Sequence, residues 1–249
     1  MKEKIIIIGS GNISWHLNKE FAQYDMPAIN IPARRFLEGD INQYKEELGK
    51  GSIIIIAVID SGISSIANKL YQEDLLKNNA IITHTSGSTS IDVLKNNKYD
   101  YGVFYPLQTF TKGIDVDFKT IPICIEGNKN DVEEKLKNLA SIISTKLYRL
   151  SSLQRKKLHI AAVFSCNFVN HLLGIAKQEL EKEDIGFDLL FPLIDQTIEK
   201  AKANSPFEVQ TGPAIRNDEA IMNWHIEDLE EEEKELYKVL SRSIINKHR

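Results

Sequence analysis

The fold is indicated most clearly by one segment near the start of the chain, Ile5-Ile6-Ile7-Ile8-Gly9-Ser10-Gly11-Asn12-Ile13-Ser14. Its run of branched apolar residues followed by Gly-x-Gly predicts a parallel strand, buried on both faces, that leads through a tight turn into a helix. A dinucleotide pyrophosphate binds at such a turn in a Rossmann unit. Gly9 permits the turn, Gly11 lets the backbone approach the phosphates, and the helix N-terminus supplies free N–H donors.

The third small position of this motif is Ser14, where glycine or alanine is usual, and serine still permits close packing of the helix on the strand. The motif predicts cofactor contacts from Gly9, Ser10, Gly11, Asn12 and Ile13. A turn with a purely structural role is the alternative, because a glycine pattern alone is weak evidence.

Composition narrows the class of protein. The chain has 249 residues, a net charge of −4 and 27% charged residues. Because it has no excess of basic residues, we expect no nucleic-acid partner. The apolar clusters at 5–8 and 53–56 have the length of strands, and we expect neither a membrane span nor a signal peptide. Cys124 and Cys166 lack metal-ligand spacing, which predicts core cysteines, no metal site and a cytoplasmic location.

Residues 1–150 alternate between strand-like and helix-like segments, which predicts a mostly parallel, doubly wound α/β sheet in one Rossmann domain. Beyond the first strand, the candidates are 28–32, 53–58, 80–83, 101–104, 121–125 and 146–150. The end of the second strand bears on the choice of cofactor. An NAD site usually has an acidic residue about 20 residues after the glycines. Here the chain instead has Arg34 and Arg35, which suit a 2′-phosphate and predict NADP(H); a solvated loop pair is the alternative.

Polar residues follow several other strands, where ligands of α/β sheets bind. Ala57 and Val58, at the end of the third strand candidate, are predicted cofactor contacts, as is Ser86 in the segment His84-Thr85-Ser86-Gly87-Ser88. His84 is a candidate proton donor, although a loop whose hydroxyls cap the next helix is an equal alternative. Tyr105 and Gln108, in the Pro-bent turn Tyr105-Pro106-Leu107-Gln108-Thr109, are candidate substrate ligands.

Residues 151–249 have no strand pattern and predict an all-α domain with long helices at 151–182, 188–203 and 217–245. The first helix is apolar on nearly every side and should therefore be buried on every side. We expect it to pack against the Rossmann domain, a second subunit or both, which makes a homodimer the expected assembly.

The same helix carries polar residues on one side. At 100° per residue, Cys166 and Asn170 each lie within roughly 20° of His159. His159 and Asn170 are candidate catalytic residues and Asn167 a candidate substrate ligand, with internally satisfied polar groups as the alternative. The long loop at 204–218 contributes Arg216 as a further substrate ligand, or as a residue that holds the loop down.

With these motifs in view, the chain resembles a bacterial family of Rossmann-like proteins of unassigned function that are labelled putative NADP oxidoreductases. The resemblance covers nearly the whole chain. It rests on Gly9-Ser-Gly-Asn-Ile13, His84-Thr-Ser-Gly-Ser88, Tyr105-Pro-Leu-Gln-Thr-Phe110, His159-Ile-Ala-Ala-Val-Phe-Ser-Cys-Asn167 and Gln210-Thr-Gly-Pro-Ala-Ile-Arg216. The layout is similar to that of pyrroline-5-carboxylate reductase and the 6-phosphogluconate dehydrogenase-like superfamily. That similarity implies hydride transfer in a cleft between a Rossmann domain and a helical dimerisation domain.

The sequence departs from these relatives at the acid–base residue. The Lys-x-x-x-Asn pair of β-hydroxyacid dehydrogenases is absent after Lys156 and Lys157, and no tyrosine begins a Tyr-x-x-x-Lys motif. Two functions therefore stay open. One is an NADP(H)-dependent oxidoreductase acting on a small carbonyl, imine or hydroxy compound, and the other is a non-catalytic NADP(H)-binding sensor or regulatory dimer.

Overall fold

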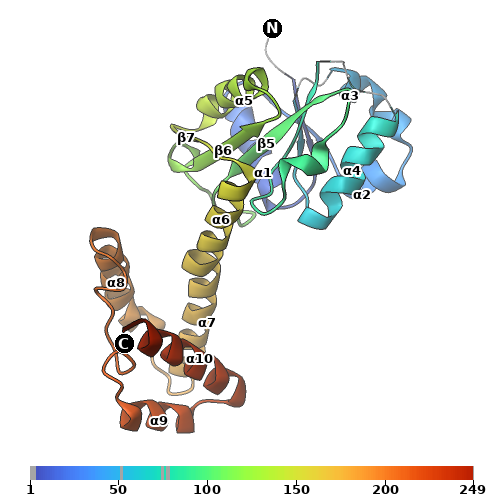
Figure 1. Ribbon diagram of the computed structural model, residues 1–249. Coiled ribbons are helices and arrows are strands. Elements are labelled where there is room, and N and C mark those ends of the chain that lie inside the picture. Colours follow the sequence, from blue (N-terminus) through green and yellow to red (C-terminus); the bar gives the residue numbers. More distant parts are fainter. Residues whose placement is uncertain (1–3, 51–52, 74–75, 77–78, 249) are drawn as a thin grey trace. The chain divides into compact units, whose positions relative to one another are not determined.

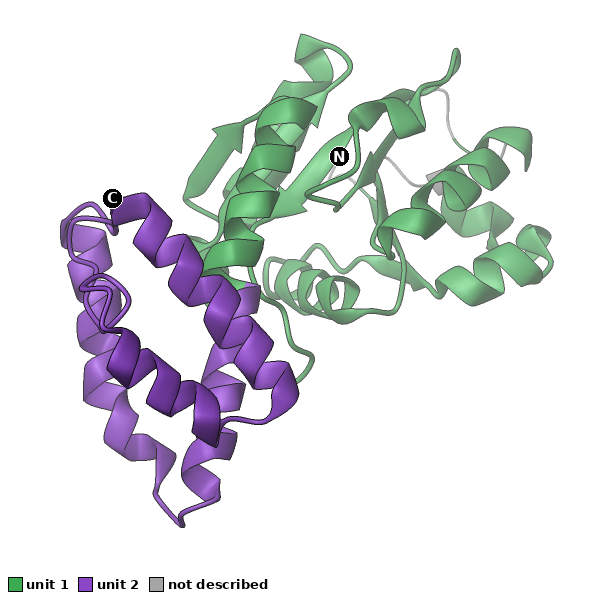
Figure 2. Ribbon diagram, turned by 60° about the horizontal axis from the view of Figure 1, so that its bottom comes forward, with its two compact units in different colours: residues 1–166 green, residues 167–249 purple. Residues whose placement is uncertain are grey.

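The computed structural model describes residues 4–50, 53–73, 76 and 79–248 (Figure 1). The chain divides into two compact units, Met1–Cys166 and Asn167–Arg249, which Figure 2 shows in green and purple. The sequence predicted the division at residue 150. It lies later because the first turns of the helix that begins at Ser152 are bonded to the strands and loops of the first unit.

The first unit is built on a seven-stranded sheet with the order β2-β1-β3-β4-β5-β6-β7. Every neighbouring pair is parallel except β5 and β6, which are antiparallel. The strands are β1 (Ile5–Ile8), β2 (Ile29–Ile31), β3 (Ile53–Ile56), β4 (Ile81–His84), β5 (Asp100–Pro106), β6 (Pro122–Gly127) and β7 (Lys146–Arg149). The predicted α/β Rossmann fold, with a mostly parallel sheet, is confirmed.

Helices cover both faces of this sheet, which is why its inner strands are continuous apolar runs. On one face Ile5 and Ile7 pack with α1 and α5, and on the other Ile6 and Ile8 pack with α2, α3 and α4. The helices are α1 (Asn12–Gln23), α2 (Ala33–Glu38), α3 (Lys45–Lys50), α4 (Asp60–Glu73) and α5 (Asn130–Ile143), with short 3₁₀ turns at Ile41–Tyr44, Ile91–Leu94 and Phe118–Thr120.

The order of the strands reverses at β1, because the chain runs from β1 outward to β2 and then returns to β3 on the other side. The carboxyl ends of β1 and β3 therefore form the topological switch point, where open α/β sheets bind ligands. The two ends are in register, with Ile8 beside Ile56, and the Ala57 N–H donates to the Ile8 carbonyl at 2.9 Å. The glycine turn begins at this point.

A single helical segment, Ser152–Glu181, runs across the division between the units. It consists of α6 (Ser152–Ala162), a π-helical turn (Val163–Asn167) and α7 (Phe168–Glu181). The second unit continues with a 3₁₀ turn (Phe187–Leu190), α8 (Phe191–Ala203), α9 (Glu219–Asp228) and α10 (Glu231–His248), so the helix predicted at 217–245 is two helices. The all-α character of this region is as predicted.

The second unit buries few of its side chains. Of its described residues, 167–248, only Ala214 and Met222 are buried, at 6% and 7% exposed. The expectation that α6 and α7 are buried on every side is not met within the described chain, where Phe164 is 65% exposed. Cys124 is buried as expected, but Cys166 is exposed.

The segment Ser152–Glu181 bears on the expectation that the chain has no membrane span. It is 30 residues long and contains an 18-residue window with a mean hydropathy of 1.4, so by length and composition alone it could cross a membrane. Length and composition are weak evidence for a membrane span, because the core helix of a soluble protein passes the same test. A covered face is the alternative explanation of the same residues.

Candidate functional site

The glycine turn at the end of β1 has the geometry that the sequence predicts. Gly9 has a φ of +155°, and a Cβ atom built on it would lie 2.1 Å from the carbonyl oxygen of Ala57, so this position admits only glycine. Gly11 precedes the first turn of α1, and a Cβ built on it would meet no atom within 4 Å. The space beside Gly11 is therefore open and no side chain caps the start of α1, as a phosphate-binding turn requires.

The side chains of Ser14 and Asn30 stabilise this turn by hydrogen bonds to its backbone. The Ser14 hydroxyl, 1% exposed, donates to the Gly9 carbonyl at 2.9 Å. With its nitrogen as donor, the Asn30 amide reaches the Gly9 carbonyl at 2.9 Å, and Ser14 Oγ and the Ile7 carbonyl at 3.1 Å each. The sequence analysis missed Asn30. A polar residue inside the apolar strand Ile29-Asn30-Ile31 is the signal that could have found it.

The other predicted residues of the turn have different surroundings. The Asn12 side chain donates to the Phe110 carbonyl at 2.9 Å and accepts from the Lys112 N–H at 3.3 Å, so it fixes the loop after β5 over α1. Ile13 is half-buried against the core, and Ser10 is exposed. Ser10, Gly11 and Asn12 are thus the exposed residues of the turn, and the Asn12 side chain is already bonded to the loop after β5.

Arg34 and Arg35 lie in the first turn of α2, directly after β2. Both are exposed, and Arg34 Nε donates to Glu38 Oε2 at 2.9 Å in a surface ion pair of the weak, solvent-screened kind. At the neighbouring strand, Ala57 is buried with its backbone against Gly9, and Val58 is half-buried. These four residues follow the ends of β2 and β3, and their cofactor contacts stay predictions.

His84 corrects a prediction. Its side chain is 0% exposed, and its Nδ1 accepts from the Ser86 N–H at 3.1 Å. Burial, with the nearby Arg155 guanidinium adding to it, lowers the pKa of His84 to about 4, so the ring is neutral at ordinary pH. A proton donor must touch its substrate. A sealed, neutral His84 instead shapes the loop that follows β4.

The hydroxyls of the 84–89 loop are also used internally. Ser86 is 6% exposed, and its Oγ accepts from the backbone N–H groups of Ser88 and Thr89 at 3.1 and 2.9 Å. Asp60, the first residue of α4, accepts a hydrogen bond from the Ser88 hydroxyl. The structural alternative thus describes Ser86 better than a cofactor contact through its hydroxyl.

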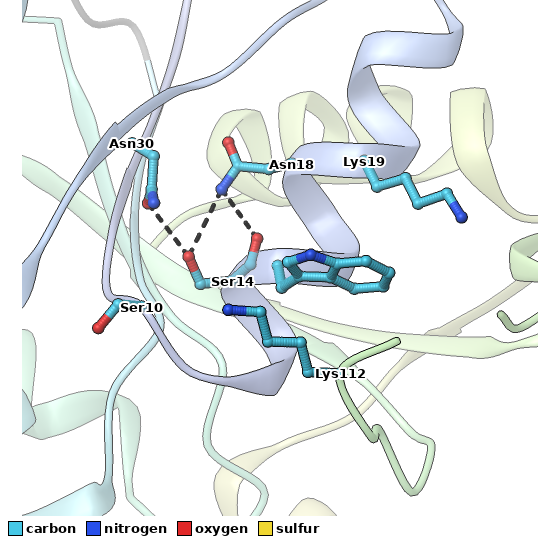
Figure 3. Close-up of a pocket in the computed structure, with 7 residues that line it drawn as sticks. Ser10, Ser14, Asn18, Lys19, Asn30 and Lys112 are labelled. Carbon is cyan, nitrogen blue, oxygen red and sulfur yellow. Dashed lines mark hydrogen bonds between the residues drawn. The ribbon is translucent and has the colours of Figure 1, made fainter. Parts of the chain in front are cut away.

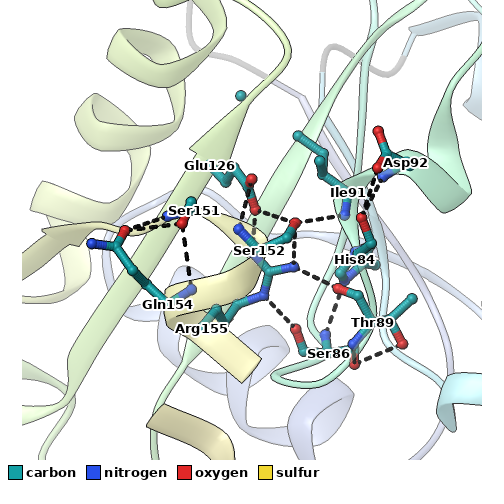
Figure 4. A network of polar contacts seen from close by, with 12 residues as sticks. His84, Ser86, Thr89, Ile91, Asp92, Glu126, Ser151, Ser152, Gln154 and Arg155 are labelled. Atoms are coloured by element: carbon teal, nitrogen blue, oxygen red, sulfur yellow. Dashed lines mark hydrogen bonds and ion pairs between the residues drawn. The ribbon is translucent and has the colours of Figure 1, made fainter. Parts of the chain in front are cut away.

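Arg155 joins α6 to this loop (Figure 4). Its side chain is 1% exposed, and its Nε donates to the Ser86 carbonyl at 3.1 Å while another nitrogen donates to the Thr89 carbonyl. Its guanidinium also forms an ion pair with Glu126 on β6. Glu126 in turn accepts from the Ser152 N–H at 2.9 Å. Sequence reasoning missed both charged residues of this pair.

Tyr105 and His159 come together beside the same loop. The Tyr105 hydroxyl lies 3.3 Å from His159 Nδ1, and the Tyr105 side chain is 7% exposed at the end of β5. Burial, with the Cys124 thiol adding to it, raises the pKa of Tyr105 to about 12. A Cβ on Gly87 would lie 2.7 Å from both His159 Nδ1 and Tyr105 Cζ, so the loop backbone touches this pair directly.

The polar residues predicted to share one side of the long helix, His159 and Asn170, do not lie on the same side. The π-helical turn at Val163–Asn167 inserts about one residue into the helical repeat, which moves Asn170 to roughly 80° from His159 instead of 20°. Asn167, Asn170 and Arg216 are exposed, and Gln108 is exposed with its side-chain oxygen accepting from the Thr109 N–H at 2.8 Å. The site that the first unit forms from the predicted residues is the pair Tyr105 and His159.

Comparison with known proteins supports the fold and the family. Residues 121–244 match the profile of a domain of unknown function, DUF2520. The structure is similar to that of a "putative NADP oxidoreductase" from Bacteroides fragilis, with 34% sequence identity, a TM-score of 0.84 and 98% of each chain covered. The chain belongs to the same family as this Bacteroides fragilis protein. The family resemblance predicted from the sequence motifs is therefore confirmed.

More distant structures share the fold. A protein from Thermotoga maritima is 19% identical over 98% of each chain, with a TM-score of 0.65. An imine reductase from Myxococcus stipitatus in complex with NADP+ is 12% identical over 98% of this chain and 92% of its own, with a TM-score of 0.58. No curated protein matches this chain in sequence.

Proposed function

We propose that this protein is an NADP(H)-dependent oxidoreductase that transfers a hydride to or from a small carbonyl, imine or hydroxy compound. The observation that carries the proposal is the glycine turn at the switch point of the sheet, closed against Ala57 at Gly9 and open to solvent at Gly11. Membership of the same family as the Bacteroides fragilis "putative NADP oxidoreductase" supports it. A substrate site that includes residues of the second unit stays a prediction.

In this proposal the glycine turn and the start of α1 bind the cofactor, and other side chains supply the proton. The N–H groups at the start of α1 and the Gly11 backbone would hold the pyrophosphate, because they combine free donors with the positive end of the helix. NADPH supplies the hydride when it is bound. The protein then has to position the substrate and provide a proton.

Tyr105 suits the role of proton donor in the direction of reduction. Its pKa of about 12 keeps the hydroxyl protonated at ordinary pH, so it holds a proton for the heteroatom of a carbonyl or imine. His159 Nδ1, at 3.3 Å, orients the hydroxyl and receives or returns the proton as the tyrosine cycles. His84 stays neutral beneath the loop and positions it.

Binding of NADPH is tested with a pair of glycine variants. Gly11→Ala adds a methyl group where the free protein has space, so folding stability should change little while phosphate approach is blocked. We expect at least a tenfold loss of NADPH affinity. Gly174→Ala, on α7 with equally open surroundings, is the matched control and should bind like the wild type.

Thermal unfolding in the presence of NADPH or NADH measures this affinity. NADPH at 100 times its dissociation constant should stabilise the wild type by about 2.7 kcal/mol. The cofactor proposal fails if neither dinucleotide stabilises the wild type or if Gly11→Ala binds as well as Gly174→Ala. Binding of NADPH without turnover of any carbonyl, imine or hydroxy compound would favour the sensor function instead.

We also propose that the second unit forms a homodimer. Its described residues bury only Ala214 and Met222, which is too small a core for an independent fold. Apolar side chains remain exposed on α7 and α8, including Leu172 at 36% and Phe191 at 51%. A second copy of the chain would cover such surfaces on both subunits at once.

Sedimentation of the purified chain should therefore give twice the mass of the 28.3 kDa monomer. Leu172→Glu places a charge on an apolar face and should shift the mass toward the monomer or abolish folding. Gln178→Glu, an exposed position on the same helix, should leave the dimer intact. A monomeric wild type at micromolar concentration would contradict this assembly.

A further inference from the structure

A cavity of about 550 Å³ lies along α1, between the glycine turn and the loop that follows β5 (Figure 3). Its lining includes Ser10 from the turn, Trp15 from α1, Asn30 from β2 and Lys112 from the loop. The volume is within the range of small-ligand sites. We call it the α1 pocket. Asn30 brings β2 into its lining, and sequence reasoning assigned this pocket no role.

The loop that carries Lys112 is fixed to α1 by several contacts. Asn12 bonds the loop at the Phe110 carbonyl, 2.9 Å away, and at the Lys112 N–H, 3.3 Å away. His16, 3% exposed, contacts the Thr111 carbonyl through Nε2 at 3.0 Å, and Phe110 is buried at 8% exposed. The backbone of Lys112 is therefore held at a defined place beside the start of α1.

The charges around the pocket favour an anion. Lys19 forms an ion pair with Asp115, whereas Lys112 has no ion-pair partner in the part of the chain that the structure describes. Figure 3 shows Lys112 directed back toward the Ser10 and Ser14 end of the pocket, with Lys19 directed away from it. The first turn of α1 contains no acidic residue. One cation thus adds to the positive end of the helix.

The position of the pocket indicates which anion. In a Rossmann unit the adenosine ribose lies beside the end of β2, where its 2′ substituent is read. Asn30 and Ser10 place the pocket at this side of the glycine turn. Neither Arg34 nor Arg35, which sequence reasoning assigned to the 2′-phosphate, lines the pocket, and Arg34 is engaged with Glu38.

We propose that the α1 pocket binds the 2′-phosphate of NADPH and that Lys112 determines the preference for NADPH over NADH. This inference rests on the proposed function, since it assigns a subsite for the same cofactor. The Lys112 ammonium forms a charge-assisted hydrogen bond with the phosphate, and Ser10 supplies a hydroxyl beside it. Because NADH lacks that phosphate, it forms no such hydrogen bond with Lys112.

The test compares Lys112→Ala with Lys146→Ala, an exposed lysine on β7 at the other edge of the sheet. Affinities for NADPH and NADH are measured by thermal shift and by isothermal titration, with adenosine 2′,5′-bisphosphate and AMP as fragment probes. Lys112→Ala should weaken NADPH and the bisphosphate at least tenfold and leave NADH and AMP unchanged. Lys146→Ala should weaken none of the four.

The other outcomes separate the two proposals. If the wild type binds neither dinucleotide, the proposed function fails and this inference fails with it. If the wild type binds NADPH but Lys112→Ala weakens NADPH and NADH equally, or neither, the assignment of Lys112 to the 2′-phosphate is overturned while the cofactor proposal stands. If Arg34→Ala loses the preference for NADPH over NADH and Lys112→Ala keeps it, the 2′-phosphate binds at the end of β2 and not in the α1 pocket.

Discussion

Replacement of Arg155 by methionine is expected to lower the free energy of unfolding by about 3–5 kcal/mol. The arginine side chain is 1% exposed and its ion-pair partner Glu126 is 15% exposed, so the change would leave a carboxylate nearly sealed and without its cation. The carbonyls of Ser86 and Thr89 would also lose their donor. This loss is large because the groups left behind are mostly shielded from water.

Urea denaturation measures the effect, and two further variants bracket it. Arg34→Met removes an arginine whose ion pair is 86% and 66% exposed, so it should cost under about 0.5 kcal/mol. The double change Arg155→Met with Glu126→Met removes both charges and should recover part of the lost stability. A single Arg155→Met variant within about 1 kcal/mol of the wild type would contradict the buried-pair account.

The sheet was predictable because its signal is local. Runs such as Ile5–Ile8 and Ile53–Ile56 are apolar at every position, and only a strand covered on both faces uses such a run. The glycine turn was predictable for a similar reason, since the backbone conformation of Gly9 excludes other residues. In both cases the physical constraint acts on adjacent residues and leaves its mark on a few letters of sequence.

The environment of a polar side chain was harder to predict. The sequence correctly placed His84 at a strand end, but its burial and its low pKa arise only in the folded chain, where Arg155 from the much later helix α6 lies nearby. The Tyr105 and His159 pair likewise joins residues separated by 54 positions. Such pairings depend on the three-dimensional path of the chain, and a single sequence contains no local sign of them.

The polar stripe on the long helix failed for a geometric reason. A helical wheel assumes a constant rotation per residue, and the π-helical turn at Val163–Asn167 breaks this assumption between His159 and Asn170. No glycine or proline lies in that turn to announce it. His159 lies before the irregular turn and contacts Tyr105 within the first unit, and its catalytic role stays a prediction.

Replacement of Tyr105 by phenylalanine is expected to lower the rate of reduction by about 10² to 10⁴ while NADPH affinity stays unchanged. The change removes the hydroxyl that lies 3.3 Å from His159 Nδ1 and keeps the ring that packs at 6.3 Å from the imidazole. One partly buried hydrogen bond is lost, which costs about 0.5–1.5 kcal/mol of stability. Turnover should therefore fall far more than the fraction of folded protein.

The assay follows NADPH oxidation with a carbonyl or imine that the wild type reduces. Tyr148→Phe, 49% exposed on β7, is the matched control and should keep full turnover. With a pKa of about 12, Tyr105 stays protonated over the usual pH range, so loss of its proton should not limit wild-type reduction until the pH approaches 12. If Tyr105→Phe retains wild-type turnover, the proton comes from another group and the role of His159 as its orienting partner falls as well. A loss of turnover with intact NADPH binding would instead separate proton transfer from cofactor binding, because Tyr105 and the glycine turn lie on different strands of the same sheet edge.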